Sequence, residues 1–357
     1  MNNVAIFGYG TVGKGVKDLI SLNPQFNLVS IFDMPSKKDE LGSLLVTKID
    51  EIINNNKIDT VIECLGGDTL AHEVIIKSLS NHKNVITSNK ETISLHLKEY
   101  LDLANKNNVS IQFEASVGGG IPIIYPLSIQ SDFDSINEII GILNGTTNFI
   151  LTKMQKEHMP INNAILLAQK LGFAEKDPTS DLEGLDMVRK ANILASIVTK
   201  KEINNDDIPH FGISKLNDNI LKQINDKNLI LKMLTRIEFK KDHISILIIP
   251  TCLRGDNLLS KIDYETNAIS VFGKYQDPLM FVGKGAGKYP TASAILQDLI
   301  RVSKNKEYKY CNLKEKVVVK NEFTGTYLCF DDKDKLHELT NPDKKDLSKY
   351  KFVCLVD

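Results

Sequence analysis

The chain has 357 residues, of which 42% are hydrophobic and 25% charged, and 44 Lys and Arg residues balance 45 Asp and Glu residues to a net charge of −1. This composition predicts a folded protein of two or more domains and argues against a disordered chain. A balanced charge attracts no polyanion, and no apolar run approaches the roughly 20 residues of a membrane helix, so we expect neither a nucleic acid nor a membrane as partner.

The cysteines and the first residues indicate the compartment. There are five cysteines, an odd number, and they are far apart without a CxxC motif: Cys64, Cys252, Cys311, Cys329 and Cys354. The chain begins with Met1-Asn2-Asn3 and enters an apolar segment without a basic leader. We therefore expect reduced thiols, no zinc site formed by cysteines, and a cytoplasmic location.

The first 115 residues alternate short apolar segments with longer amphipathic ones. We predict strands at residues 4–7, 28–32, 60–65, 84–87 and 109–113, and helices near 14–20, 70–79 and 97–107. Strands that alternate with helices are typical of βαβ units around a parallel sheet. This part therefore reads as an α/β nucleotide-binding fold.

Gly8, Gly10 and Gly13 form a G-x-G-x-x-G sequence directly between the first predicted strand and a helix. In that context the first glycine permits a tight turn, the second lets the backbone approach a pyrophosphate, and the third lets helix and strand pack closely. The N–H groups at the helix N-terminus would bind the anion. We predict a dinucleotide-binding loop; the alternative is a tight turn without a ligand.

Asp33 ends the second predicted strand, twenty residues after Gly13. A carboxylate at this place can accept hydrogen bonds from both hydroxyls of the adenosine ribose, which favours NAD. Lys37 and Lys38 follow and could hold a 2′-phosphate, although they are equally typical of a solvated loop. The choice between NAD and NADP stays open, with Asp33 in favour of NAD.

Ligands of a doubly wound sheet lie beyond the carboxyl ends of its strands, where three further loops fall. Gly66 and Gly67 follow one strand, and a glycine there permits close approach of a cofactor. Lys90 follows the next strand and would reach the nicotinamide or the substrate; otherwise it is a surface lysine at a helix start.

The third loop runs from Glu114 through Gly118, Gly119 and Gly120 to Pro122. Three consecutive glycines suit a loop that exposes its carbonyl groups. Together with Glu114, such carbonyls can ligate a hard cation. The alternative is a flexible hinge between domains.

After Pro126 the pattern contains more β-type segments and fewer strict alternations. We predict strands at 136–143, 244–249, 268–272 and 279–282, and helices at 161–170, 181–200 and 291–302. The Lys-rich final part has short predicted strands at 316–319, 326–330 and 351–356. These segments indicate a second domain of the α+β class.

Polar residues are densest between residues 175 and 190. Ser180 and Glu183 have the spacing of a capping box, which predicts a helix from Asp181 onward.

On that helix, Asp186 and Lys190 continue the apolar stripe at 100° per residue. Charges on an inward stripe are costly unless they pair or serve a site, and a lysine in such surroundings can act as a proton donor. The alternative is an exposed i,i+4 salt bridge of little energetic weight.

Several segments together resemble the homoserine dehydrogenase family in order and spacing, from about Val4 to Val302. They are GYGTVGKGV, IECLGG, TSNK, EASVGGGIPII, GILNGTTNFILTKM, GFAEKDPTSDLEGLDMVRK and GKGAGKYPTASAILQDL. The resemblance implies the reversible reduction of L-aspartate 4-semialdehyde to L-homoserine with NADH or NADPH, in the biosynthesis of threonine, methionine and isoleucine. The cofactor supplies the hydride, and the protein supplies orientation and a proton.

The resemblance also implies roles for individual residues. Lys190 matches the general acid that contacts the substrate, and Lys90 matches a second active-site lysine at the junction of cofactor and substrate. Carboxylates that hold the substrate ammonium group match Glu175, Asp181 and Asp186. The cofactor-binding positions are Gly8, Gly10, Thr11, Val12, Gly13, Asp33, Gly66, Lys90 and Gly287. The family's site for a monovalent cation, Na⁺ or K⁺, corresponds to Glu114 and the carbonyl groups of Val117, Gly119 and Ile121.

The expected architecture is a Rossmann-type doubly wound parallel sheet with a second α+β domain for substrate binding and dimerisation. The resemblance places the NAD(P)-binding domain at residues 1–130 plus a returning helix at about 286–303, and the second domain at 131–285. It also implies a homodimer. Residues 304–357 form a short tail that looks like the opening of an incomplete ACT-type effector module, so we expect no threonine feedback through it.

Two other functions compete with this interpretation. One is another α/β dehydrogenase for an amino-acid aldehyde or keto acid, which the run from Glu175 to Lys190 argues against. The other is a catalytically inactive NAD-binding sensor on the same fold. A sensor predicts the loss of Glu175, Asp181 or Lys190, and all three are present.

Overall fold

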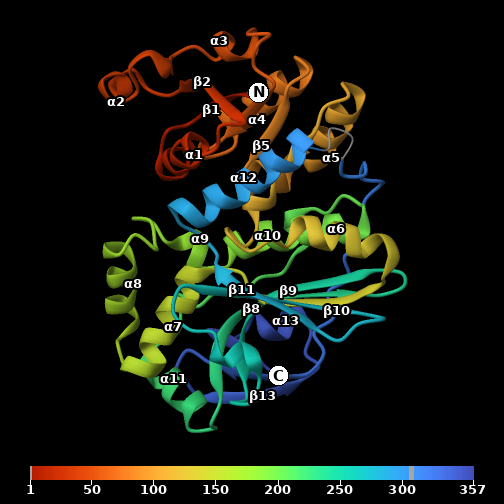
Figure 1. Cartoon of the computed structure of the whole chain (residues 1–357). Helices are drawn as coiled ribbons and strands as arrows, with labels where there is room; N and C mark the ends of the chain where they lie inside the picture. Colours follow the sequence, from red (N-terminus) through yellow and green to blue (C-terminus); the bar gives the residue numbers. More distant parts are fainter. Residues whose placement is uncertain (1, 305–308) are drawn as a thin grey trace. The chain divides into compact units, whose positions relative to one another are not determined.

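The computed structural model describes residues 2–304 and 309–357, which form two compact units (Figure 1). Unit 1 comprises Met1–Asp132, Ile193–Glu202 and Ala286–Lys316. Unit 2 comprises Phe133–Asn192, Ile203–Gly285 and Val317–Asp357. Within the described ranges, no helix is both long and apolar enough to cross a membrane.

Unit 1 is built around a six-stranded sheet in the order β3-β2-β1-β4-β5-β6, with every pair parallel. The strands are β1 (Asn2–Phe7), β2 (Phe26–Phe32), β3 (Leu45–Val46), β4 (Thr60–Glu63), β5 (Asn84–Thr87) and β6 (Ile111–Gln112). This is the usual strand order of a doubly wound dinucleotide-binding sheet. The predicted α/β class is therefore confirmed.

Helices cover both faces of this sheet, so its central strands are apolar on both sides. Besides the last part of α10 (Leu185–Thr199), the helices with residues in unit 1 are α1 (Thr11–Ser21), α2 (Lys38–Leu41), α3 (Ile49–Ile53), α4 (Thr69–Ser80), α5 (Lys90–Lys106), α6 (Ile124–Phe133) and α12 (Lys288–Lys304). In β1, Val4 and Phe7 are fully buried. Although it comes late in the chain, α12 packs against α1 (Figure 1), and Ile295 and Leu299 join Val16 in one core cluster.

Unit 2 contains an eight-stranded sheet in the order β11-β10-β7-β8-β9-β14-β12-β13. The strands are β7 (Ile136–Ile142), β8 (Ile230–Phe239), β9 (Ile244–Leu253), β10 (Thr266–Gly273), β11 (Leu279–Lys284), β12 (Thr326–Phe330), β13 (Leu336–Thr340) and β14 (Phe352–Val356). All pairs are antiparallel except β9 with β14. The helices are α7 (Gly145–Glu157), α8 (Ile161–Lys170), α9 (Thr179–Leu182), α11 (Asp218–Asn225) and α13 (Lys344–Leu347), while α10 (Leu185–Thr199) has residues in both units.

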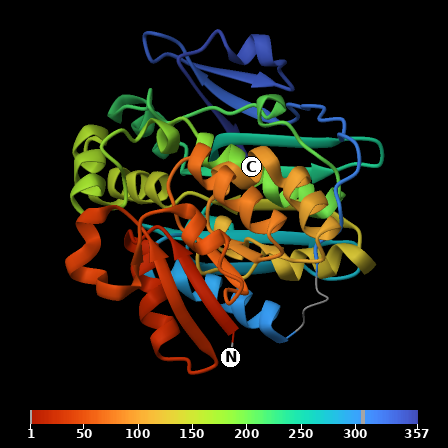
Figure 2. The same cartoon turned by 90° about the horizontal axis from the view of Figure 1, so that it is seen from above.

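The C-terminal residues continue this sheet as β12 to β14, the dark blue strands of Figure 2. The prediction of a strand at residues 316–319 is wrong. Val319 forms only an isolated bridge to Ile244, whose main chain exchanges hydrogen bonds with Val318 and Lys320. Two hydrogen bonds at the start of β9 do not extend into a ladder, because the next residues leave the sheet before β12 begins.

Candidate functional site

The glycine loop between β1 and α1 has the geometry that its sequence predicts. Gly8 has φ +95°, and a Cβ there would lie 2.7 Å from the Cys64 carbonyl oxygen. A Cβ on Gly13 would lie 2.0 Å from the Gly8 oxygen, so both positions require glycine. A Cβ on Gly10 would meet no atom within 4 Å. The loop is therefore tightly packed on one side and has room for a pyrophosphate beside Gly10.

Thr11 and Val12 are the first residues of α1. The first N–H groups of a helix have no acceptor within the helix, so they are available to an anion. Together with the space beside Gly10, they fit the pyrophosphate of a dinucleotide.

Asp33 joins this loop to the end of β2. Its Oδ2 accepts a hydrogen bond from the Tyr9 N–H at 2.5 Å, and its Oδ1 accepts one from the Met34 N–H at 2.7 Å. Each carboxylate oxygen can accept a further hydrogen bond. Asp33 can thus hold the loop and still bind ribose hydroxyls.

The lysines that follow Asp33 have partners of their own. Lys38 Nζ donates to the Gly42 carbonyl at 3.1 Å. Glu40 lies 3.8 Å from Lys37 Nζ and 2.9 Å from Lys14 Nζ. The hydrogen bond from Lys14 lowers the pKa of Glu40, whose side chain is exposed. A negative charge among these lysines disfavours a bound 2′-phosphate.

The loops after β4 and β5 are joined at the same edge of the sheet. Asn89 Nδ2 donates to the Gly67 carbonyl at 2.6 Å, while Asn89 Oδ1 accepts from the Glu91 N–H at 3.1 Å and caps α5. Lys90 is the first residue of α5 and is half-buried. The structure thus brings the loop of Gly66 close to the helix that begins at Lys90.

Glu63, the last residue of β4, is a buried carboxyl group that the sequence interpretation missed. It is 0% exposed; its Oε1 accepts from the Leu65 N–H at 2.6 Å, and its Oε2 accepts from the Thr87 hydroxyl. Burial raises its pKa to about 7, although these hydrogen bonds act in the opposite direction. The signal was present in the sequence, because glutamate is rarely found inside an apolar strand unless its carboxyl group has partners.

Glu114 lies in a second buried polar group of unit 1, together with Asp298 and Arg301 of α12. Its carboxylate accepts backbone hydrogen bonds from Ile123 at 2.6 Å and Tyr125 at 2.8 Å. Asp298 Oδ2 accepts from the Glu114 N–H at 2.9 Å, and Asp298 Oδ1 accepts from Arg301 at 2.8 Å. Burial raises the pKa of Glu114, and burial with the charge of Glu114 raises that of Asp298 to about 8.

The predicted cation ligands lie in the loop that follows Glu114. Gly118 and Gly119 have positive φ values of 71° and 56°, which turn the backbone sharply. Val117 and Ile121 are buried. In the part of the chain that the structure describes, no hydrogen bond reaches the carbonyl oxygens of Val117 and Gly119. Such oxygens, together with the buried carboxylate of Glu114, are ligands of the kind that a hard cation takes.

The helix predicted from Asp181 to Lys200 is interrupted, which corrects the sequence interpretation. A short helix, α9, begins at Thr179 without a side-chain cap, so Ser180 and Glu183 form no capping box. Gly184 then has φ +82°, and α10 begins at Leu185. The left-handed conformation of Gly184 ends the first helix, as glycine commonly does.

Asp186 and Lys190 form a buried ion pair on α10. Their exposed fractions are 5% and 7%. Lys190 Nζ donates to Asp186 Oδ2 at 2.6 Å and to the Leu143 carbonyl at 2.6 Å. The alternative of an exposed salt bridge is therefore wrong.

Asn144 connects this pair to Asp181. Its Nδ2 donates to Asp186 Oδ2 at 2.9 Å and to Asp181 Oδ1 at 2.7 Å, while its Oδ1 accepts from the Thr147 N–H at 2.8 Å and caps α7. The side chain of Asn144 thus orients both carboxylates. Its cap function could be read from the sequence, whereas its contacts with Asp181 and Asp186 could not.

Two predicted residues lie apart from these contacts. Glu175 is exposed in the loop before α9, and its side chain forms no hydrogen bond or ion pair with the described residues. Gly287 has φ +119° and directly precedes α12. The structure therefore brings Asp181, Asp186 and Lys190 together in unit 2 but does not bring Glu175 into contact with them.

Comparisons with known proteins agree with these features. Residues 8–114 match the family described as "Homoserine dehydrogenase, NAD binding domain", and residues 122–300 match "Homoserine dehydrogenase". The homoserine dehydrogenase of Bacillus subtilis is 36% identical over 315 residues, which is 85% of this chain and 73% of that protein.

Two solved structures have a similar fold. A homoserine dehydrogenase from Thiobacillus denitrificans gives a TM-score of 0.85 at 28% identity, over 93% of this chain and 83% of that chain. A hyperthermophilic archaeal homoserine dehydrogenase in complex with NADPH gives a TM-score of 0.74 at 27% identity, over 88% of this chain and 99% of that chain.

The raised pKa of Glu63 predicts a pH-dependent stability. Between its ordinary value of 4.5 and about 7, the native state binds more protons than the unfolded state, so the free energy of unfolding falls as pH rises through this window. In Glu63→Gln this contribution, on the order of 3 kcal/mol, should disappear. Urea unfolding at pH 5 and pH 8 measures it.

The control is Glu73→Gln on the exposed surface of α4, which should keep the pH dependence of the wild type. A Glu63→Gln variant whose stability changes between pH 5 and pH 8 as much as that of the wild type would refute the assignment.

Proposed function

This chain belongs to the homoserine dehydrogenase family, and on that basis we propose how its own residues perform the family reaction. The reaction is the reversible, NAD(P)H-dependent reduction of L-aspartate 4-semialdehyde to L-homoserine. We assign cofactor binding to unit 1 and substrate binding to unit 2. The predicted domain borders near residues 130 and 285 and the separate tail after 303 stay predictions.

Lys190 is the proposed proton donor. Bound NAD(P)H supplies a hydride to the aldehyde carbon, and the aldehyde oxygen then needs one proton to become the hydroxyl group. A lysine ammonium has three N–H donors, and Lys190 uses two of them for Asp186 and the Leu143 carbonyl. The third can bond to the aldehyde oxygen and stabilise the developing alkoxide before the proton moves. This buried, two-bonded ammonium group is the observation that carries the proposal.

Carboxylates of unit 2 would bind the other end of the substrate. Asp181 offers negative charge to its α-ammonium group, and Asn144 keeps Asp181 in place. Glu175 stays a predicted substrate ligand, because its side chain is exposed and does not contact these residues. Asp186 pairs with Lys190 and not with the substrate, because it balances the ammonium charge of Lys190 within the buried site. Lys90 and Gly66, at the carboxyl edge of the sheet in unit 1, are proposed to contact the cofactor.

We expect Lys190→Met to lower kcat by about 10²- to 10⁴-fold, because general acid catalysis contributes that much. The affinity for NADH should stay within a few-fold of the wild type, since the glycine loop is unchanged. Steady-state kinetics and NADH fluorescence titration measure the two quantities.

The control is Lys98→Met, which breaks an i,i+4 ion pair of the same 2.6 Å length with Asp102 on the exposed face of α5. It should leave kcat unchanged. Because Lys190→Met leaves Asp186 buried without its partner, Lys190→Arg serves as a second variant that keeps the charge but does not donate a proton. A folded Lys190→Arg enzyme with near wild-type kcat would contradict the proposal.

We further propose a preference for NADH. Asp33 offers a carboxylate to the ribose, and Glu40 forms ion pairs with Lys14 and Lys37 that offset their positive charge. Both features disfavour a 2′-phosphate.

In Asp33→Asn, the amide oxygen can still accept from the Tyr9 N–H, but the negative charge is gone. The ratio of kcat/KM for NADH to that for NADPH should therefore fall by about tenfold or more, since a hydrogen bond to a charged group contributes about 1.5–3 kcal/mol. An unchanged ratio, or a wild-type enzyme that prefers NADPH, would exclude this assignment of Asp33.

A monovalent cation, Na⁺ or K⁺, is proposed at Glu114 and the carbonyl groups of Val117, Gly119 and Ile121. The buried Glu114 carboxylate and the Val117 and Gly119 carbonyl oxygens support the site, because a hard cation prefers oxygen ligands of these two kinds. The cation would hold the loop without entering the chemistry.

K⁺ or Na⁺ should then raise the thermal midpoint above that in tetramethylammonium chloride of the same ionic strength, because an ion that binds only the folded state stabilises it. Glu114→Gln should abolish this difference. Equal midpoints of the wild type in all three salts would rule out the site.

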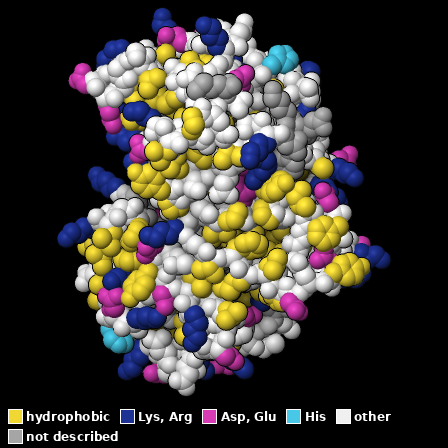
Figure 3. All heavy atoms as spheres, viewed as in Figure 1, with side chains coloured by type: hydrophobic (Ala, Val, Ile, Leu, Met, Phe, Trp, Pro, Cys, Tyr) yellow, Lys and Arg dark blue, Asp and Glu magenta, His cyan; other side chains and the backbone are white. Residues whose placement is uncertain are grey.

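The proposal extends to a cytoplasmic homodimer in the biosynthesis of threonine, methionine and isoleucine. The edge strand β11 supports the dimer, since Leu279 and Val282 are 42% and 52% exposed and Tyr275, just before it, is 72% exposed. Figure 3 shows apolar side chains gathered over the strands that Figure 1 labels β10 and β11. An exposed apolar edge strand is suited to pairing with a second chain.

A further inference from the structure

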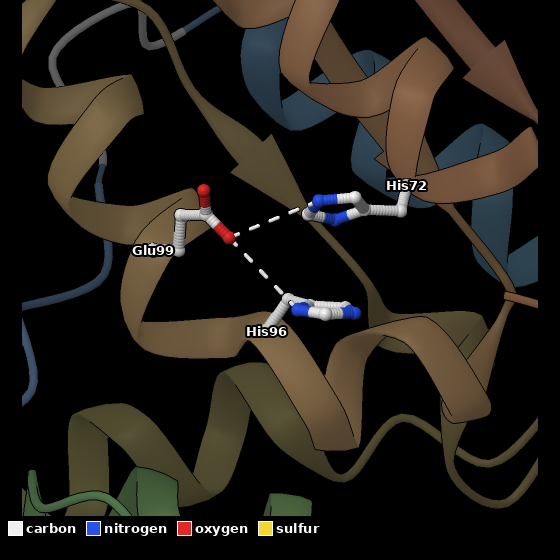
Figure 4. Close-up of side chains that lie close together, drawn as sticks. All are labelled: His72, His96 and Glu99. Atoms are coloured by element: carbon white, nitrogen blue, oxygen red, sulfur yellow. Dashed lines mark ion pairs between the residues drawn. The ribbon is translucent and has the colours of Figure 1, made fainter. Parts of the chain in front are cut away.

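Two histidines and a glutamate of unit 1 meet between α4 and α5, and none of the three is assigned to catalysis or cofactor binding. Figure 4 shows one oxygen of Glu99 directed at a nitrogen of each imidazole ring. Glu99 Oε2 lies 4.0 Å from His72 Nε2 and 3.9 Å from His96 Nδ1. One ligand atom from each residue lies within 4.8 Å of the other two. The three side chains thus bring two nitrogens and one oxygen into one small cluster.

The opposite nitrogen of each ring already has a hydrogen-bond partner. His72 Nδ1 bonds to the Tyr100 hydroxyl at 2.8 Å, and that hydroxyl bonds to Thr92 Oγ1 at 2.5 Å. His96 Nε2 lies 3.2 Å from the Asp68 carboxylate. Histidines that bind a metal almost always donate their second N–H to such a group, which sets the tautomer and orients the ring. The nitrogens left for a metal are therefore the two that face Glu99.

An ordinary ion-pair cluster explains this arrangement less well. At 3.9 and 4.0 Å, Glu99 is too far from either ring to form a hydrogen bond. The ring centroids of His72 and His96 are only 4.0 Å apart, so two protonated rings would repel each other. A tetrahedral ion with bonds of about 2.0–2.1 Å needs ligand atoms about 3.4 Å apart, so Glu99 would have to approach each histidine nitrogen by only about half an ångström.

We propose that His72, His96 and Glu99 bind one divalent transition-metal ion, for which Zn²⁺ is the best match. Two imidazole nitrogens and one carboxylate oxygen suit Zn²⁺, whereas Ca²⁺ and Mg²⁺ prefer oxygen ligands alone. The side chains of His72 and His96 are 31% and 28% exposed, so an ion reaches them from solvent and water completes its coordination.

The ion would fasten α4 to α5 at the carboxyl edge of the sheet. Asp68 immediately precedes α4 and follows Gly67, while Lys90 begins α5. The ion would therefore brace the two helices that follow the loops of Gly66 and Lys90. The primary effect is on the stability of unit 1.

Isothermal titration of the full, chelator-treated chain with ZnCl₂ tests the proposal without an activity assay. We expect one Zn²⁺ per chain and a higher thermal midpoint with Zn²⁺, since the ion binds only the folded arrangement. His96→Gln and His72→Gln should each weaken binding at least tenfold and remove the rise in midpoint. Asp68→Asn should weaken binding by about 10- to 100-fold, as second-layer partners of metal-bound histidines do.

The matched control is His337→Gln, which removes a histidine whose Nε2 lies 3.1 Å from Asp331 in unit 2 and leaves Zn²⁺ binding unchanged. Cys311→Ser controls for the exposed thiol and should also have no effect. No binding at micromolar Zn²⁺, binding that survives both histidine substitutions, or binding that is lost in Cys311→Ser would overturn the proposal.

Discussion

The buried ion pair of Asp186 and Lys190 is the interaction on which the candidate catalytic site depends. Removal of two charges from water is costly, and a buried pair rarely adds net stability compared with apolar side chains. The pair is tolerated because both side chains have further hydrogen bonds: Lys190 also donates to the Leu143 carbonyl, and Asn144 donates to Asp186. Loss of either charge would leave the other buried without compensation. An ammonium group held in this way is positioned for proton transfer before any substrate arrives.

Carboxylates perform a similar positioning task at the ligand-binding edge of unit 1. Asp33 accepts the N–H of Tyr9 in the glycine loop, Glu63 accepts that of Leu65, and Glu114 accepts those at the start of α6. Each acidic side chain thereby holds a loop or helix start that follows a strand. Burial raises the pKa values of Glu63 and Glu114, which is the energetic cost of this arrangement. The cluster of His72, His96 and Glu99 lies on helices that begin at the same edge.

The sequence predicted the elements whose partners are local. The strand at 84–87 agrees with β5 and the helix at 161–170 with α8, because apolar periodicity and nearby breakers determine them. The sequence-based predictions failed where tertiary packing determines the bounds of a helix or strand. Gly184 divides the helix predicted at 181–200, and a Cβ there would lie 2.9 Å from Ile248, a residue of β9 that no local pattern indicates. The predicted strand at 316–319 lacks a second partner strand and remains a single bridge.

The amino-acid sequence by itself determined the α/β class, the glycine loop and the positions of the charged residues on α10, since these follow from spacing along the chain. Only the tertiary structure decided what those charges contact. Leu143 is 47 residues from Lys190, and Asp298 is 184 residues from Glu114. The cost of a buried charge depends on the donors and acceptors that folding brings to it, and such partners leave no regular pattern in the sequence. For the same reason, spacing alone did not reveal that two separate helices bring His72, His96 and Glu99 together.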